Sequence, residues 1–260
     1  MIIKTENSYL LSSVKNALKV LNAFTIEQPE WGIRDLAKHL NISHSSIKRI
    51  MYTLGSEGFV NQDSITKRYR LGARILGFNK IITDSLEIHQ EALPILNELV
   101  KKTNETAHIS VLEGNGIVYL HKVEPIKSIR VFTEIGKAAP CYCIAGGKAI
   151  LAHQTGDQIE SVIAEGLKPY TNKTITDPEE FRNHLKEIKS KGFAISHGEY
   201  LKEGEILSIA SPIFDYTGRA FASVSLVGIA EKITQSMLDY NISQVKKAAK
   251  IISKNLGYYQ

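Results

Sequence analysis

Residues 33–71 carry the sequence IRDLAKHLNISHSSIKRIMYTLGSEGFVNQDSITKRYRL, from which the architecture of the N-terminal third follows. The stretch begins with an apolar-periodic run that predicts a short helix over about 33–40. Asn41 comes next and can end that helix in the left-handed conformation. Ser43 is then a suitable N-cap for another helix. The stretch therefore predicts two short helices joined by a tight turn.

The helix after Ser43 has one apolar and one polar face. Apolar residues at i, i+3, i+4 and i+7 predict a core-facing stripe of Ile47, Ile50, Met51 and Leu54. The polar face holds hydroxyls, cations and a tyrosine, and no acidic residue. Such a face suits DNA phosphates and base edges, although an ordinary solvated helix face has the same polarity. The predicted DNA contacts of this helix are Ser45, Ser46, Lys48, Arg49 and Tyr52.

A basic hairpin follows this helix. Residues 59–62 and 69–71 have the pattern of two short strands with a polar connection between them. A hairpin in this place is a wing, and Lys67 and Arg68 are the residues we expect at its DNA-facing end. Together with a preceding amphipathic helix over 12–24, the order predicts a winged helix-turn-helix that binds double-stranded operator DNA.

The charge distribution agrees with a basic head on a neutral body. The net charge is +5, and residues 1–80 hold 12 Lys/Arg against 6 Asp/Glu, whereas residues 81–260 hold 20 against 21. Clustered cations favour a polyanionic partner, although chance clustering of surface lysines gives the same count.

Composition narrows the class of protein further. Hydrophobic residues make up 43% of the 260 residues, as in ordinary globular proteins. We expect no membrane association, because no apolar run approaches the roughly 20 residues that span a bilayer. Two cysteines, no secretory signal and no disulfide framework fit a cytoplasmic location.

The chain divides into a DNA-binding domain over 1–72, a linker helix over 73–90 and an effector-binding domain over 91–260. Pro94 predicts that the linker helix ends at about residue 89 and that a new helix starts near 91. The apolar stripe of the linker helix needs a partner, and a second copy of the chain is the simplest one. A homodimer would then read two half-sites.

The C-terminal two-thirds predict an α+β fold, an antiparallel sheet with helices packed on it. Helices are expected from about Ala145 to His153, from Asp177 to Gly192, and over about 234–255. Strands are expected at 107–112, 117–121, 129–132, 193–197, 206–213 and 220–227.

Known catalytic motifs are missing from this part of the sequence. Gly146-Gly147-Lys148-Ala149 lacks the earlier glycine and the final Ser or Thr of a phosphate loop. Cys141-Tyr142-Cys143 lacks the spacing and the second pair of a zinc site. We therefore expect no enzyme, no cofactor and no bound metal. Three alternatives stay open: an enzyme tethered to DNA by the basic head, a pure dimerisation module, and a metal bound by Cys143 and a histidine.

Small residues before the helix at Ala145 allow two interpretations. Exposed backbone N–H groups there can hold a carboxylate or a hydroxyl. Alternatively, the small residues only permit tight helix–sheet packing.

In the order and spacing of its motifs the chain resembles the IclR family of bacterial transcriptional regulators, over roughly residues 10–256. The motifs that carry the resemblance are Ser13–Leu21, Ser45–Arg49, Gly58–Val60, Arg68–Gly72, Gly147–Ala149, Thr174–Pro178 and Gly192–Ile195.

The resemblance implies a GAF-like effector domain behind the winged head. Such proteins form dimers and often tetramers. Many repress catabolic operons and some activate, and a bound small organic acid or sugar-acid-like effector changes the DNA-bound assembly. The effector positions that carry over to this chain are Tyr142, Cys143, Ala145, Gly146, Ser196, His197, Ser208 and Ser225.

Four positions depart from the family pattern. The usual acid is replaced at Ser196 and His197, a frequent cysteine is Ser208, one of two paired serines is Val227, and Tyr142-Cys143 replaces His-Ala. The effector is therefore expected to differ from the smallest keto acids.

Overall fold

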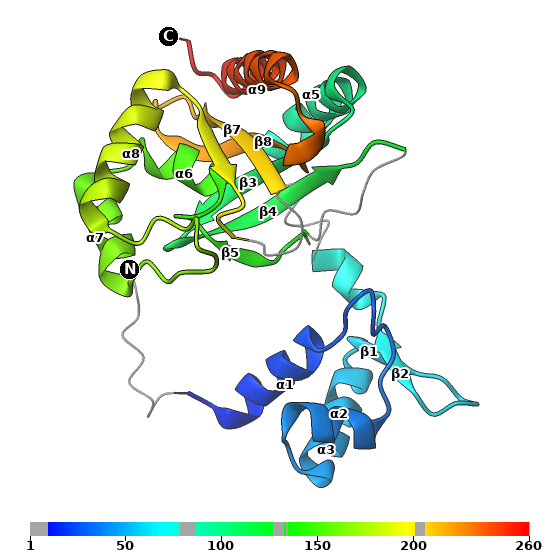
Figure 1. Ribbon diagram of the computed structural model, residues 1–260. Helices are drawn as coiled ribbons and strands as arrows, with labels where there is room; N and C mark the ends of the chain where they lie inside the picture. The colour runs from blue at the N-terminus through cyan, green and yellow to red at the C-terminus, as the bar shows by residue number, and fades with distance from the viewer. Residues whose placement is uncertain (1–9, 79–86, 127–132, 134, 201–205, 260) are drawn as a thin grey trace. The chain divides into compact units, whose positions relative to one another are not determined.

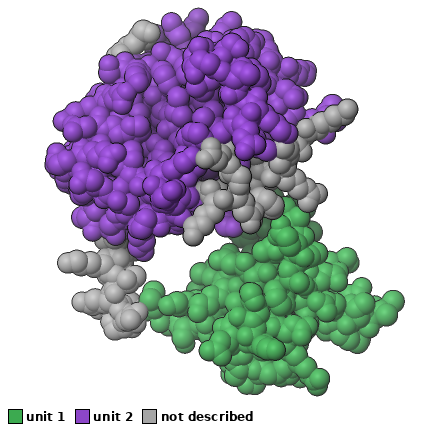
Figure 2. Space-filling view, viewed as in Figure 1, with its two compact units in different colours: residues 1–85 green, residues 86–260 purple. Residues whose placement is uncertain are grey.

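The computed structural model describes residues 10–78, 87–126, 133, 135–200 and 206–259. The chain forms two compact units, residues 1–85 and 86–260, which Figure 2 colours separately. The division falls inside the predicted linker over 73–90. Each unit has its own hydrophobic core.

Unit 1 begins with three short helices, α1 (Ser12–Asn22), α2 (Ile33–Leu40) and α3 (His44–Ser56) (Figure 1). Asn41 ends α2 in the left-handed conformation with a φ of 52°, as its sequence predicts. The side chain of Ser43 caps α3 by accepting a hydrogen bond from the Ser46 N–H at 3.2 Å. The shared core of this unit consists of Val20, Ala23, Leu36, Ile47, Met51, Leu54 and Val60.

The predicted wing is a two-stranded antiparallel hairpin of β1 (Val60–Gln62) and β2 (Tyr69–Leu71). Trp31 extends the hairpin by exchanging backbone hydrogen bonds with Tyr69 at 2.9 and 2.8 Å. The Trp31 indole N–H also donates to the carbonyl of Ala23 at 2.8 Å. The wing is therefore fixed to the helices by the segment that precedes α2.

Unit 2 is built on six antiparallel strands in the order β5-β4-β3-β8-β7-β6. The strands are β3 (Thr106–Glu113), β4 (Gly116–Val123), β5 (Ala138–Pro140), β6 (Ala194–His197), β7 (Ile206–Phe214) and β8 (Ala220–Ile229). This arrangement confirms the α+β prediction. The short edge strand β5 is not among the predicted strands, and the strand predicted at 129–132 lies outside the described residues.

Helices cover both faces of this sheet. On one face α5 (Glu87–Thr103) and α9 (Gln235–Asn255) share an apolar core with the sheet (Figure 1). On the other face α6 (Ala145–Leu151), α7 (Gly156–Glu165) and α8 (Pro178–Lys191) pack around a second core. The sequence predicts α8 and α9 well, places the end of α6 two residues too late, and misses α7.

The predicted break near Pro94 is wrong, because α5 runs through this residue without interruption. An internal proline costs a helix roughly 3 kcal/mol through a lost hydrogen bond and a steric clash. The helix nevertheless buries one apolar stripe on both sides of Pro94, and this burial outweighs the local cost. The stripe consists of Ile88, Ala92, Leu96, Leu99 and Val100.

Candidate nucleic-acid interface and effector site

Helix α3 presents the predicted DNA-contacting face to solvent. Lys48 and Arg49 are exposed, and the Tyr52 side chain is 79% exposed. Ile47 and Met51 on the opposite face are fully buried, so the helix cannot turn without exposing its core. Lys48, Arg49 and Tyr52 are therefore accessible to DNA when α3 lies in a major groove.

The two predicted serines of α3 have different settings. Ser45 is exposed, whereas Ser46 is half-buried and accepts a hydrogen bond from the Ser43 hydroxyl at 2.8 Å. Ser46 therefore belongs to the cap of the helix. His44, at the first helical position, is exposed beside Ser45 and is a further candidate contact that the apolar-stripe argument did not single out.

The tip of the wing is organised by Asp63. Its carboxylate accepts hydrogen bonds from the N–H groups of Ile65 and Thr66 at 2.9 and 2.7 Å and from the Thr66 hydroxyl. These bonds, led by that of the Thr66 N–H, lower the pKa of Asp63 below its usual value. Lys67 then adopts a φ of 59° and leaves its side chain exposed. The turn thus presents a cation while its acid is used internally.

Arg68, in contrast, turns back onto its own unit. Its guanidinium donates to the Glu30 carbonyl at 3.1 Å and lies 3.9 Å from the Asp35 carboxylate. The structure therefore does not place Arg68 with Lys67 as a second exposed cation of the wing. Arg70, on β2, is exposed instead. Strand alternation does not separate the two arginines, because residues two apart point to the same side; the contacts of Arg68 with Glu30 and Asp35 do.

In unit 2, strand register gathers polar side chains on the face of the sheet beneath α6. His108 pairs with Ser225, and Ser110 pairs with Ser223, across β3 and β8. A Cβ built at Gly146 would lie 2.8 Å from Ser110 Oγ and 2.9 Å from Ser223 Oγ, so these serines face α6. We call this surface the polar face, and its buried members are Thr106, His108, Ser110, Ser196, Ser208, Ser223 and Ser225.

Four of the eight predicted effector positions meet at the polar face. Gly146 covers it, and Ser196, Ser208 and Ser225 belong to it. The Ser196 hydroxyl donates to the Cys143 carbonyl at 2.9 Å and so joins β6 to the segment before α6.

His197 is not brought to this face. It pairs with Leu207, whose side chain belongs to the core shared with α5 and α9, so His197 lies on the other side of the sheet from Ser196. A sequence resemblance carries over both neighbours, whereas a strand can direct only one of them inward.

The remaining predicted positions are packed into the core around α8. Tyr142 donates its hydroxyl to the Lys168 carbonyl at 3.0 Å, and Ala145 is fully buried. Burial, followed by the nearby Glu199, raises the pKa of the Cys143 thiol, which stays protonated. The described residues contain no cluster of three His, Cys, Asp or Glu side chains fit for a metal ion.

Sequence reasoning missed His108, the most perturbed group on the polar face. It is fully buried, and its Nε2 shares a hydrogen bond with the Thr133 hydroxyl at 2.6 Å. Burial lowers the pKa of His108 to about 3, so the imidazole is neutral. Its Nδ1 has no hydrogen-bond partner among the described residues. Alternation over Thr106, His108 and Ser110 is the signal that could have found it.

A buried ion pair joins the two segments that frame the polar face. Lys148 of α6, 0% exposed, donates to a Glu199 carboxylate oxygen at 2.6 Å and lies 3.2 Å from His184 Nε2. Burial lowers the pKa of Lys148, and the Glu199 charge opposes that change. The pair fixes α6, which carries Gly146, against the segment that follows Ser196.

Comparison with known proteins agrees with a helix-turn-helix domain followed by a regulator C-terminal domain. The family model for the IclR helix-turn-helix domain matches residues 13–64, and that for the bacterial transcriptional regulator IclR C-terminal domain matches residues 81–254.

No helix among the described residues is long and apolar enough to cross a membrane.

Individual relatives align over nearly their whole length. The transcriptional regulator KipR of Bacillus subtilis is 29% identical over 95% of this chain and 97% of its own. KdgR of Escherichia coli is 28% identical over 96% and 94%, respectively.

Solved structures agree as well. The crystal structure of Thermotoga maritima IclR has a TM-score of 0.80 at 30% identity, covering 95% of this chain and 99% of that one. An IclR homologue of Microbacterium hydrocarbonoxydans, complexed with 4-hydroxybenzoate, shares the fold with a TM-score of 0.81 at 22% identity, covering 94% and 99%. The chain therefore belongs to the IclR family of bacterial transcriptional regulators.

Proposed function

We propose that this regulator is a repressor of a catabolic operon, and that a small hydroxylated organic acid bound at the polar face controls it. The observation that carries the proposal is the pairing of an exposed cationic helix in unit 1 with a buried, polar sheet face in unit 2. On this face His108 Nδ1 is buried without a hydrogen-bond partner among the described residues, and a buried polar atom of this kind is costly unless a ligand or a water satisfies it.

The charges around the polar face favour an effector with few negative charges. Lys148, the buried cation nearest to Gly146, already pairs with Glu199, and His108 is neutral. An effector carboxylate would therefore be held by hydroxyl and backbone donors, and its hydroxyls by serines and His108. A hydroxy acid or a sugar acid fits this set better than a dicarboxylate.

The fold-related homologue in complex with 4-hydroxybenzoate supports a hydroxylated acid, since that ligand carries one carboxylate and one hydroxyl. Because Ser196, Ser208 and Val227 depart from the family pattern, the effector has to be identified for this chain itself.

A homodimer completes the proposal. Helix α1 and the two residues before it expose four apolar side chains, Leu10, Leu11, Val14 and Leu18, although Val20 of α1 is buried. An exposed apolar row of this kind is typical of an association surface, and a second copy would cover it. Light scattering of Leu18→Asp against the wild type tests this: the variant should be monomeric or more weakly associated.

The decisive experiment measures coupling. A thermal-shift screen of hydroxy acids and sugar acids on the full chain identifies a ligand, and selection from a random duplex library identifies an operator sequence. The dissociation constant of the duplex is then measured with and without the ligand, and that of the ligand with and without the duplex. Thermodynamic linkage requires equal factors in both directions.

Each outcome has one meaning. Mutually unchanged affinities would refute effector control. Conversion of the bound compound to a product would establish the tethered-enzyme alternative, and the absence of any ligand from the panel would favour a dimerisation module.

A further inference from the structure

A cavity lies at the edge of the sheet in unit 2, and none of its lining residues is a predicted effector position. Its volume is about 730 Å³, within the range of small-molecule sites. Strand β6 pairs with β7 only over Leu207–Ala210, so the rest of β7 has no described strand on that side. Helix α9, the end of α8 and the segment after α9 surround this open edge.

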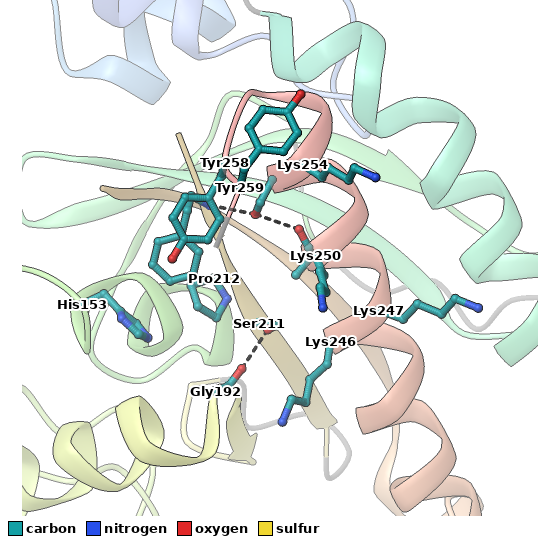
Figure 3. Close-up of a pocket in the computed structure, with 13 residues that line it drawn as sticks. His153, Gly192, Ser211, Pro212, Lys246, Lys247, Lys250, Lys254, Tyr258 and Tyr259 are labelled. Carbon is teal, nitrogen blue, oxygen red and sulfur yellow. Dashed lines mark hydrogen bonds between the residues drawn. The ribbon is translucent and has the colours of Figure 1, made fainter. Parts of the chain in front are cut away.

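The cavity has a cationic wall. Lys246, Lys247, Lys250 and Lys254 of α9 line it, and no acidic side chain is among its thirteen described lining residues. Figure 3 shows Lys246 and Lys250 on the side of Ser211 and Gly192, while Lys247 and Lys254 point away from it. Lys246 and Lys250 are one helical turn apart, about 6 Å along the axis.

The position of Lys246 is fixed by its surroundings. Its ammonium group donates to the Lys191 carbonyl at 2.9 Å and lies 5.7 Å from the centre of the Phe193 ring. Lys250 is exposed and forms no ion pair with the described residues. Two ammonium groups with no carboxylate between them attract an anion to this wall.

The other end of the cavity is aromatic. The rings of Phe214 and Tyr258 stack with centroids 4.9 Å apart, and Tyr259 is 79% exposed beside them. Ser253 fixes this end, since its hydroxyl accepts from the Phe214 N–H at 3.0 Å and its carbonyl accepts from the Tyr258 N–H at 2.9 Å. Aromatic rings held in this way are platforms for a flat ligand ring.

We propose that this cavity is a second ligand site and that it binds a nucleoside phosphate. The phosphate groups lie between Lys246 and Lys250, and the base stacks at the Tyr258 end. Lysine suits phosphate as a compact point charge, and stacking on an aromatic side chain accepts any base. The site is independent of the effector bound at the polar face.

The test uses the full chain with Lys48→Ala and Arg49→Ala, so that unit 1 binds the polyanionic probes more weakly. ATP and inorganic tripolyphosphate are titrated separately by calorimetry at about 0.15 M salt, where the Debye length is about 8 Å. Lys250→Glu should weaken the binding of both about tenfold or more, because it removes one charge-assisted contact and adds repulsion. Tyr258→Ala should weaken ATP about fivefold or more and leave tripolyphosphate unchanged, because only ATP carries a ring.

The matched control is Lys101→Glu, which makes the same charge change on an exposed position of α5. It should leave both affinities within about twofold, since exposed charges farther apart than the Debye length are largely screened. The proposal is overturned if ATP does not bind at about 1 mM, a free energy near 4 kcal/mol. It is also overturned if Lys250→Glu and Lys101→Glu act alike, or if an oligoglutamate peptide binds there in place of ATP.

Discussion

The two units place the basic residues of the candidate DNA interface and effector site in opposite settings, exposed in unit 1 and buried in unit 2. In unit 1, Lys48, Arg49 and Tyr52 are exposed on a helix whose other face is core. In unit 2, Lys148 and His108 are fully buried beneath helices. A DNA-binding surface does not have to exclude water, so its charged side chains can stay hydrated. A buried small-molecule site excludes water, and its charged side chains are therefore neutralised or paired. Substitutions of these five residues should accordingly change DNA affinity in unit 1 and stability in unit 2.

The largest effect is expected for Lys148→Ala. It leaves the Glu199 carboxylate buried without its partner, and breaking a buried pair in this way costs roughly 3–5 kcal/mol. Urea unfolding, followed by a signal from unit 2, measures the change.

The control for this variant is Lys148→Met with Glu199→Gln, which removes both charges and should recover most of the lost stability. Equal loss in the single and the double variant would show that packing of the lysine stem, not charge pairing, is what matters.

Arg49→Ala should weaken binding to the selected operator by roughly 1–3 kcal/mol if Arg49 contacts a base, and relax specificity at one base position.

Lys67→Ala should weaken binding to all duplexes alike and lower the magnitude of the slope of log affinity against log salt concentration by about one unit. Gel shifts on operator and scrambled duplexes separate the two. Arg68→Ala is the control, because its guanidinium already binds Glu30 and Asp35. Unchanged operator affinity in Arg49→Ala combined with Lys67→Ala would rule out the proposed surface.

His108 should make unit 2 less stable in mild acid. Its pKa of about 3 in the folded state lies below the usual 6.5, so between these values the unfolded chain binds a proton that the folded one does not. Stability from this group is present above pH 6.5 and is lost as the pH falls. From pH 7 to 5.5 the loss is about 1 kcal/mol. His108→Asn should flatten this dependence in urea unfolding, and an unchanged slope would contradict the assignment.

The smallest effect is expected for the cap of α3. Ser43→Ala removes the acceptor of the Ser46 N–H and should destabilise unit 1 by about 1 kcal/mol. Ser45→Ala, a substitution in the first turn of α3, should change stability by less than about 0.5 kcal/mol. Thermal unfolding of both variants gives the comparison, and equal losses would mean that the cap does not stabilise α3.

A site can be predicted from sequence when the residues that position it lie close together along the chain, and not when they are far apart. The exposed face of α3 is set by a helical period within thirteen residues, so Lys48, Arg49 and Tyr52 could be placed from sequence alone. Arg68 could not, because what decides its direction is Glu30 and Asp35, more than thirty residues away. In the same way Pro94 predicts a helix break, although tertiary burial of α5 outweighs the cost of the proline.

The amino-acid sequence alone determined the family, the winged head and the α+β body, because turn residues, caps and apolar periods act over short distances. Only the tertiary structure decided which side chains share the polar face. The register of β3, β8, β7 and β6 brings in His108 and Ser110 and turns His197 away, and register depends on pairings between strands up to about 120 residues apart. The lysine-lined cavity likewise exists only because β6 is shorter than its neighbour and α9 lies along the edge that β6 leaves open.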